Sequence, residues 1–233
     1  MAEATDSPRR VDALDGLRAV AALSVVGYHS WLYTLPRVST GAHHTTTDLI
    51  WHELRLGLVL FFVLSGFLLY LPWVRAARES GQAPSVIAYA LRRAARIVPA
   101  YWIAVLGSIA LLWSHAGEPG VRLPPSGDLW LFAVFGQNFN EATLLKLNAP
   151  LWTLAVEATF YVVLPLLGWL ALRAGRWAGA VAAPLAFGLL GVLYNWHYSS
   201  KHGLSPTVSK LLPAMAPYFA VGMLAAVAAY GRT

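Results

Sequence analysis

The sequence contains no cysteine, and few of its residues carry a charge. The missing cysteine excludes a thiol nucleophile, a disulfide framework and a cysteine-ligated metal. Charged residues make up 12% of the chain, against roughly 25% in soluble domains. Hydrophobic residues make up 58% of the 233 positions. This balance indicates a membrane protein, in which any covalent intermediate would form on Ser, His or another side chain without a thiol.

The sequence contains several long apolar runs. A run of ~20 residues crosses the hydrocarbon of a bilayer. Six runs are predicted to span: about 14–35, 54–74, 97–113, 151–172, 177–194 and 211–230. A seventh, 129–135, is too short to span and is predicted to be re-entrant or interfacial. We therefore expect an all-α, polytopic transmembrane helix bundle with about six spanning helices and one short re-entrant or interfacial segment.

The formal net charge of +6 comes mostly from arginines at the ends of apolar runs. This placement favours orientation in the membrane over nucleic-acid binding. Three arginines flank the first run, and five lie in a basic connection between the second and third runs: Arg9, Arg10, Arg18, Arg75, Arg78, Arg92, Arg93 and Arg96. Both places are predicted to face the cytoplasm. Residues 1–12 are then a cytoplasmic tail, and residues 13–233 form the domain of a multi-pass protein of the plasma membrane. The first run lacks a small-residue cleavage site, so we interpret it as a retained helix.

Two ionisable residues share one face of the first predicted helix. Arg18 and His29 are eleven positions apart, which brings them to within about 20° of each other around a helix and about 16 Å apart along it. Ionisable residues inside membrane helices are costly and mark functional sites. The alternatives are that Arg18 is a topology marker and that His29 satisfies a tertiary hydrogen bond. The layout suits a ligand with an anionic head and a reactive tail.

Four segments in order resemble motifs of one family. Residues 14–23 read Leu-Asp-Gly-Leu-Arg-Ala-Val-Ala-Ala-Leu and lead to His29; residues 61–67 read Phe-Phe-Val-Leu-Ser-Gly-Phe; residues 93–99 read Arg-Ala-Ala-Arg-Ile-Val-Pro; and residues 152–157 read Trp-Thr-Leu-Ala-Val-Glu. Together they resemble the acyltransferase-3 family of membrane acyltransferases, including its Arg, ten residues, His spacing. The resemblance implies that residues 13–233 are a membrane acyltransferase domain. Members have about ten helices, so we expect this chain to be truncated at its C-terminus.

The resemblance also implies a reaction. Family members move an acyl group, commonly acetyl from acetyl-CoA, onto a hydroxyl of a glycan, a lipid-linked sugar or a macrolide. No tightly bound cofactor or metal is expected, and the partners are acyl-CoA, the hydroxyl acceptor and the lipid bilayer. His29 is the candidate general base, because an unperturbed histidine titrates near neutral pH. Glu157 is its candidate catalytic neighbour. Arg18, Arg93, Arg96 and Ser65 are candidates for binding the acyl donor.

Other readings of the same residues remain. The basic-connection arginines could serve topology alone, and Ser65 beside Gly66 could serve helix packing. Trp152 and Tyr161 could line an acceptor pocket, although such rings more often anchor or pack. His43 and His44 lie near Asp48 in a polar loop, and we assign them no metal. A transporter or channel that uses Arg18, His29 and Glu157 as a substrate or proton path is the alternative function, and a non-catalytic acyl-presenting module is a third.

Overall fold

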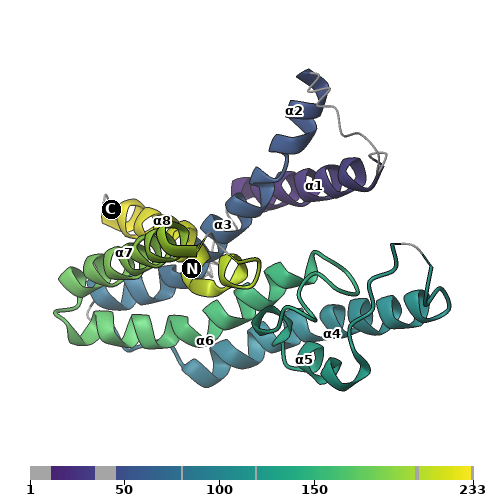
Figure 1. Ribbon diagram of the computed structural model, residues 1–233. Coiled ribbons are helices and arrows are strands. Elements are labelled where there is room, and N and C mark those ends of the chain that lie inside the picture. The colour runs from purple at the N-terminus through teal and green to yellow at the C-terminus, as the bar shows by residue number, and fades with distance from the viewer. Residues whose placement is uncertain (1–11, 35–45, 80, 119, 203–204, 232–233) are drawn as a thin grey trace, which may run out of the picture. The chain divides into compact units, whose positions relative to one another are not determined.

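The computed structural model describes residues 12–34, 46–79, 81–118, 120–202 and 205–231, and the regular secondary structure in these ranges is helical throughout. The helices, shown in Figure 1, are α1 (Asp12–Thr34), α2 (Thr46–Glu53), α3 (Leu56–Arg78), α4 (Val86–Trp113), α5 (Trp130–Ala133), α6 (Leu151–Arg173), α7 (Trp177–His202) and α8 (Leu212–Gly231). The prediction of an all-α, polytopic bundle is confirmed.

Five stretches of the described residues are long and apolar enough to cross a membrane. They are Thr46–Arg78, Val86–Trp113, Leu151–Arg173, Trp177–Ser200 and Val208–Tyr230. The first predicted span corresponds to α1, which has 23 residues. It is not among the five stretches that are apolar enough to cross a membrane. The polar residues Asp15, Arg18 and His29 lower its hydropathy, so the crossing of α1 stays a prediction.

Several helix boundaries differ from the sequence interpretation; α7, for example, extends to His202 rather than ending near Tyr194. Helix α4 begins at Val86 rather than near Ile97, and the Ser85 Oγ caps it by accepting from the Ala88 amide at 3.3 Å. Three of the five arginines assigned to a basic connection therefore lie in the first half of this helix. Helix α2 forms where a polar loop was predicted. Such boundaries are hard to predict because polar residues at the end of a spanning helix read as loop.

The short apolar segment 129–135 does not span, as predicted. Its helix, α5, has four residues, which cover only about 6 Å. Phe132 is buried, and its carbonyl accepts from the Tyr101 hydroxyl at 2.7 Å. The Gln137 side chain then donates to the Leu151 carbonyl at 3.0 Å. The segment thus folds against α4 and the start of α6.

The chain divides into two compact units, residues 1–64 and 65–233. In the first unit, α1, α2 and the beginning of α3 pack together. The Trp31 indole donates to the Asp48 carboxylate at 3.3 Å, which joins α1 to α2. A Cβ at Gly57 would lie 2.7 Å from the Ala21 carbonyl oxygen, so this glycine permits α3 to approach α1 closely.

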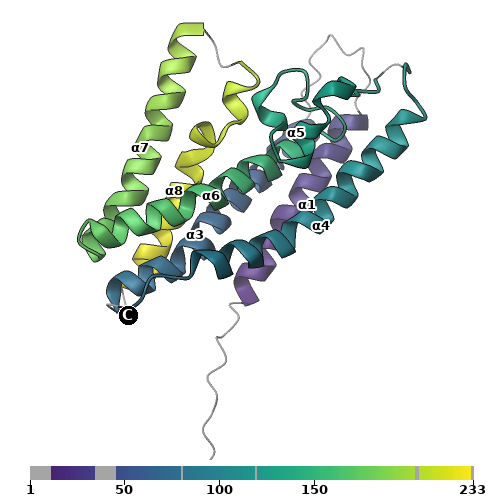
Figure 2. The ribbon, with the colours of Figure 1, turned by 90° about the horizontal axis from the view of Figure 1, so that it is seen from below.

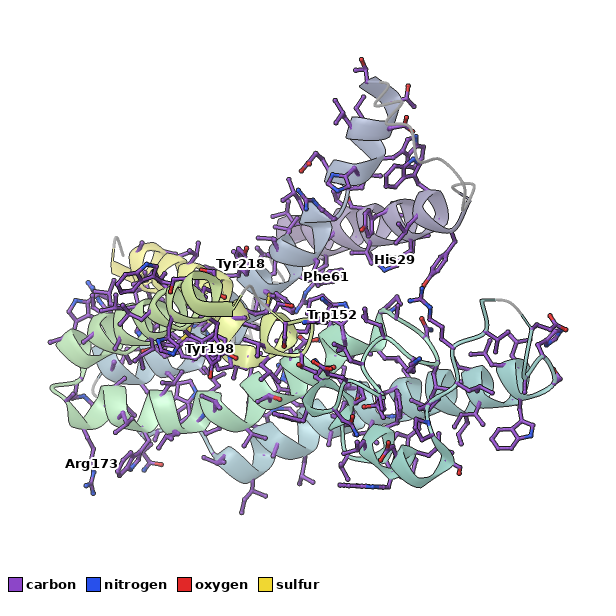
Figure 3. The ribbon with its side chains drawn as sticks, in the orientation of Figure 1. His29, Phe61, Trp152, Arg173, Tyr198 and Tyr218 are labelled. Carbon is purple, nitrogen blue, oxygen red and sulfur yellow. The ribbon has the colours of Figure 1, made fainter. Side chains whose placement is uncertain are left out.

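In the second unit, α7 and α8 lie side by side with α6 packed against both (Figure 2). The core is aromatic: Phe160 of α6 stacks on Phe219 of α8 with ring centroids 4.1 Å apart, and both are fully buried. The second half of α3 joins through Tyr70, whose hydroxyl donates to the Ala180 carbonyl of α7 at 3.0 Å. Trp152 and Arg173 mark the two ends of α6 in Figure 3.

Close packing of α3 against α8 depends on Gly66. A Cβ there would overlap the Phe219 backbone carbonyl oxygen. We expect Gly66→Ala to lower stability by about 1–3 kcal/mol, the usual cost of overpacking, measured by thermal unfolding in detergent. Gly107→Ala is the control, because a Cβ at Gly107 meets no atom within 4 Å. Equal melting temperatures for Gly66→Ala and the wild type would contradict the packing role.

Candidate active site

A carboxylate inside the second unit collects two hydroxyl donors. The Ser65 hydroxyl of α3 and the Tyr161 hydroxyl of α6 both donate to Oε1 of Glu157, at 2.8 and 2.6 Å. Glu157 and Tyr161 meet because they are four residues apart on one helix face. The second oxygen, Oε2, takes no hydrogen bond from the described residues. The carboxylate is thus held in place by one oxygen and keeps the other for an additional partner.

An apolar groove of about 380 Å³ runs between α4 and α6 beside this cluster. Its lining on α4 extends from Val86 to Val98, which corresponds to about 18 Å along the helix. On α6 it extends from Ala158 to Pro165 and includes Tyr161. Phe135, from the segment after α5, completes the lining. Tyr161 therefore contacts both the groove and the Glu157 carboxylate.

Two polar atoms of the groove-lining residues are buried without a partner. They are the Tyr89 hydroxyl oxygen and the Arg93 Nε, one turn apart on α4. The rings of Tyr89 and Tyr161 meet edge to face, with centroids 6.4 Å apart. Buried polar groups in proteins are almost always hydrogen-bonded, so two neighbouring exceptions point to a ligand.

The structure separates two of the three arginines predicted to bind the donor, Arg93 and Arg96. Arg93 lines the groove, whereas Arg96 is exposed and does not line it. Arg75 and Arg78, at the end of α3, lie instead over the rings of Tyr230 and Trp177, at 5.7 and 5.3 Å.

The first unit carries Arg18 and His29 on the uninterrupted helix α1, where Figure 3 shows His29. Arg18 lies 3.5 Å from the carboxylate of Asp15. The His29 Nδ1 lies 2.8 Å from the Val25 carbonyl oxygen. A carbonyl only accepts, so Nδ1 is the donor. In neutral His29 this leaves the Nε2 lone pair free to accept a proton.

Some predictions are not tested by these contacts. The pairing of His29 with Glu157 joins residues of different units and stays a prediction from the sequence. His43 and His44 lie outside the described residues. Across the ranges that the structure describes, no group of three His, Asp or Glu side chains is arranged to hold a metal.

Sequence reasoning missed Tyr89 and the buried amides of Gln137 and Asn138. The signal for Tyr89 was its spacing of four residues before Arg93, which places both on one helix face. Asn138 donates to the carbonyls of Trp152 and Lys210, both at 2.8 Å, and Lys210 lies over the Trp152 ring at 5.4 Å. Trp152 thus helps to anchor the segment around Asn138, between α5 and α6. It does not line the groove between α4 and α6.

Comparison with known proteins places these features in a family. The chain is 31% identical over 169 residues to the acyltransferase MdmB of Streptomyces mycarofaciens, covering 67% of this chain and 39% of that one. It is 26% identical over 178 residues to the peptidoglycan O-acetyltransferase OatA of Listeria monocytogenes, covering 68% and 24%, and 27% identical over 173 residues to O-acetyltransferase OatA of Staphylococcus aureus, covering 69% and 25%.

The match thus spans between about a quarter and two fifths of the length of these relatives. No solved structure matches the chain significantly. The family profile described as "Acyltransferase domain" matches residues 11–232, almost the whole chain. The chain is therefore a member of the acyltransferase-3 family, whose enzymes transfer acyl groups.

Proposed function

We propose that this chain is the membrane domain of an O-acyltransferase. It moves an acyl group, acetyl foremost, from acyl-CoA to a hydroxyl of a glycan, a lipid-linked sugar or a macrolide. The observation that carries this proposal is the Glu157 carboxylate, bonded through Tyr161 to the wall of an apolar groove that also contains Arg93. The names of the O-acetyltransferase relatives support the acyl group, and that of the Listeria protein supports a glycan acceptor.

The groove suits the donor. It has a long apolar lining that contains one cation, Arg93, which can donate to an oxygen of an extended thioester arm. Arg96 is exposed one turn further along α4, and we assign it to the phosphate groups of the donor. Arg18 is assigned to the donor as a second cationic anchor. Ser65 acts by holding Glu157 rather than as a nucleophile, because its hydroxyl proton is already donated to that carboxylate.

The reaction follows from general acid–base chemistry. The acceptor oxygen forms a bond to the thioester carbonyl carbon while its proton passes to Nε2 of His29. The carbon–sulfur bond then breaks, and the thiolate of CoA leaves and takes up a proton. We assign to Glu157 the role of balancing the positive charge that the base acquires.

The direct test is reconstitution of the full-length protein with labelled acetyl-CoA and a panel of glycans, lipid-linked sugars and macrolides. We expect label to appear as an ester on at least one acceptor class. Substrate-dependent proton flux with no labelled ester would contradict the proposal and favour the transporter.

Donor binding is expected to depend on Arg93 and Arg96 of α4. A charge-assisted hydrogen bond contributes about 1.5–3 kcal/mol, so Arg93→Ala combined with Arg96→Ala is expected to weaken acetyl-CoA binding by at least about tenfold, measured by calorimetry at low salt. Arg173→Ala is the control, because Arg173 lies over the Trp169 ring at the far end of α6. Unchanged affinity for acetyl-CoA in the double variant would mean that both arginines serve only to orient the protein in the membrane.

We also propose that the N-terminus is cytoplasmic and the membrane is the plasma membrane. Because the chain has no cysteine, single introduced cysteines report orientation without background. Gln82→Cys, between α3 and α4, is expected to react with an impermeant maleimide only after the cells are opened. Glu118→Cys, after α4, is expected to react in intact cells. The reverse pattern would overturn the orientation.

A further inference from the structure

The unpartnered atoms of Tyr89 and Arg93 are both hydrogen-bond donors. The phenolic hydroxyl can turn its proton toward a ligand, and the guanidinium Nε carries one fixed proton. Both atoms are buried, and both residues line the groove between α4 and α6. A buried donor left without an acceptor costs about 1–3 kcal/mol. Both groove-lining residues therefore carry a buried donor that lacks an acceptor oxygen.

The residues that line the groove indicate which kind of ligand could supply that oxygen. The lining is apolar apart from Tyr89, Arg93 and Tyr161, and Tyr161 is already engaged as a donor to Glu157. A ligand in the groove is therefore mainly hydrocarbon with a small oxygen-bearing group at the level of Tyr89 and Arg93. An acyl thioester has this composition, with one carbonyl oxygen.

We propose that the Tyr89 hydroxyl and the Arg93 Nε form the site that holds the carbonyl oxygen of the transferred acyl group. This inference rests on the proposed O-acyltransferase function. When the acceptor oxygen bonds to the carbonyl carbon, the electron pair of the carbon–oxygen double bond moves onto this oxygen, which becomes an oxyanion. When the carbon–sulfur bond breaks, the pair returns, and the thiolate carries the negative charge away. Donors fixed where charge develops stabilise the transition state more than the ground state.

A ring contact holds the Tyr89 donor in place, and the helix positions the backbone of Arg93. The Tyr89 ring packs edge to face on Tyr161, which Glu157 fixes in turn through a 2.6 Å hydrogen bond. The backbone of Arg93 is fixed one turn further along the same helix. Such preorganised donors need no reorganisation as charge develops.

The test uses Tyr89→Phe and Arg93→Lys in the full-length protein. The first change removes only the hydroxyl, and the second keeps the positive charge but has no donor at the Nε position. Removing one donor of this kind lowers kcat by about 100- to 1000-fold in other acyl-transfer enzymes, and we expect a fall of at least about tenfold for each variant here. Tyr198→Phe on α7 is the matched control, with activity and melting temperature like the wild type.

Two CoA analogues separate catalysis from donor binding. A trifluoromethyl ketone analogue of acetyl-CoA hydrates to a tetrahedral carbon that resembles the transition state, whereas S-ethyl-CoA has no carbonyl oxygen. Tyr89→Phe is expected to weaken binding of the ketone at least about tenfold and to leave S-ethyl-CoA binding unchanged. Equal effects on both analogues, or a wild-type kcat in Tyr89→Phe, would overturn this inference and leave the O-acyltransferase function standing. A wild-type protein that binds neither analogue and transfers no acetyl group would overturn both.

Discussion

His29→Ala is expected to reduce acetyl transfer by about 10²- to 10⁴-fold, the usual contribution of a positioned general base. The physical reason is the hydrogen bond from Nδ1 to the Val25 carbonyl at 2.8 Å. It fixes the ring and assigns the proton to Nδ1, so that Nε2 carries the lone pair. Alanine removes that lone pair, and no adjacent side chain of α1 replaces it. The measurement is kcat with labelled acetyl-CoA at saturating acceptor.

The matched control for this variant is His115→Ala. His115 makes the same kind of contact, from Nδ1 to the Leu111 carbonyl four residues earlier at 3.0 Å, but it is exposed just beyond α4. Its replacement therefore removes an equivalent local bond with no expected change in rate. Transfer that persists undiminished in His29→Ala would remove His29 from the role of base.

Glu157→Gln is expected to lower kcat by about 100-fold or more while the protein stays folded. Glutamine keeps an oxygen that can accept from Ser65 and Tyr161, so the local hydrogen bonds of 2.8 and 2.6 Å can persist. What is lost is the negative charge that, in the proposed mechanism, balances the protonated base, an electrostatic contribution that is large in a low-dielectric site. The measurement is kcat together with the melting temperature and the Kd for acetyl-CoA.

Glu118→Gln, an exposed change of the same type after α4, is the control for altered net charge. A fall in kcat with unchanged melting temperature and Kd identifies a role of the carboxylate in the reaction. A melting temperature that falls in parallel with activity would instead assign Glu157 to structure alone.

The fold could be predicted because a bilayer imposes a simple requirement. Apolar runs such as 151–172 and 211–230 were located within about a residue of α6 and α8, since a spanning helix must be long and apolar. The ends of the helices were harder to predict from the sequence. The part of α4 that contains Arg92, Arg93 and Arg96 was interpreted as a connection, because charged residues near the end of a spanning helix resemble those of a loop.

The site could be predicted only in its separate pieces. Glu157, Ser65 and Arg93 were found because each lies in a family motif, but sequence spacing cannot show that a serine of α3 donates to a carboxylate 92 residues later. Tyr89 was missed for a related reason. A tyrosine near the end of a spanning helix reads as an interfacial anchor, and only packing shows its hydroxyl to be buried and unpartnered.

The central claim is that the groove between α4 and α6 holds the acyl donor beside Glu157. The most direct measurement is photolabelling of the full-length protein with an acyl-CoA analogue that carries a diazirine in its acyl chain, followed by peptide mass spectrometry. We expect label on residues 86–98 and 158–165, and we expect excess acetyl-CoA to suppress it. Label that acetyl-CoA suppresses but that lies wholly outside these two stretches would contradict the claim.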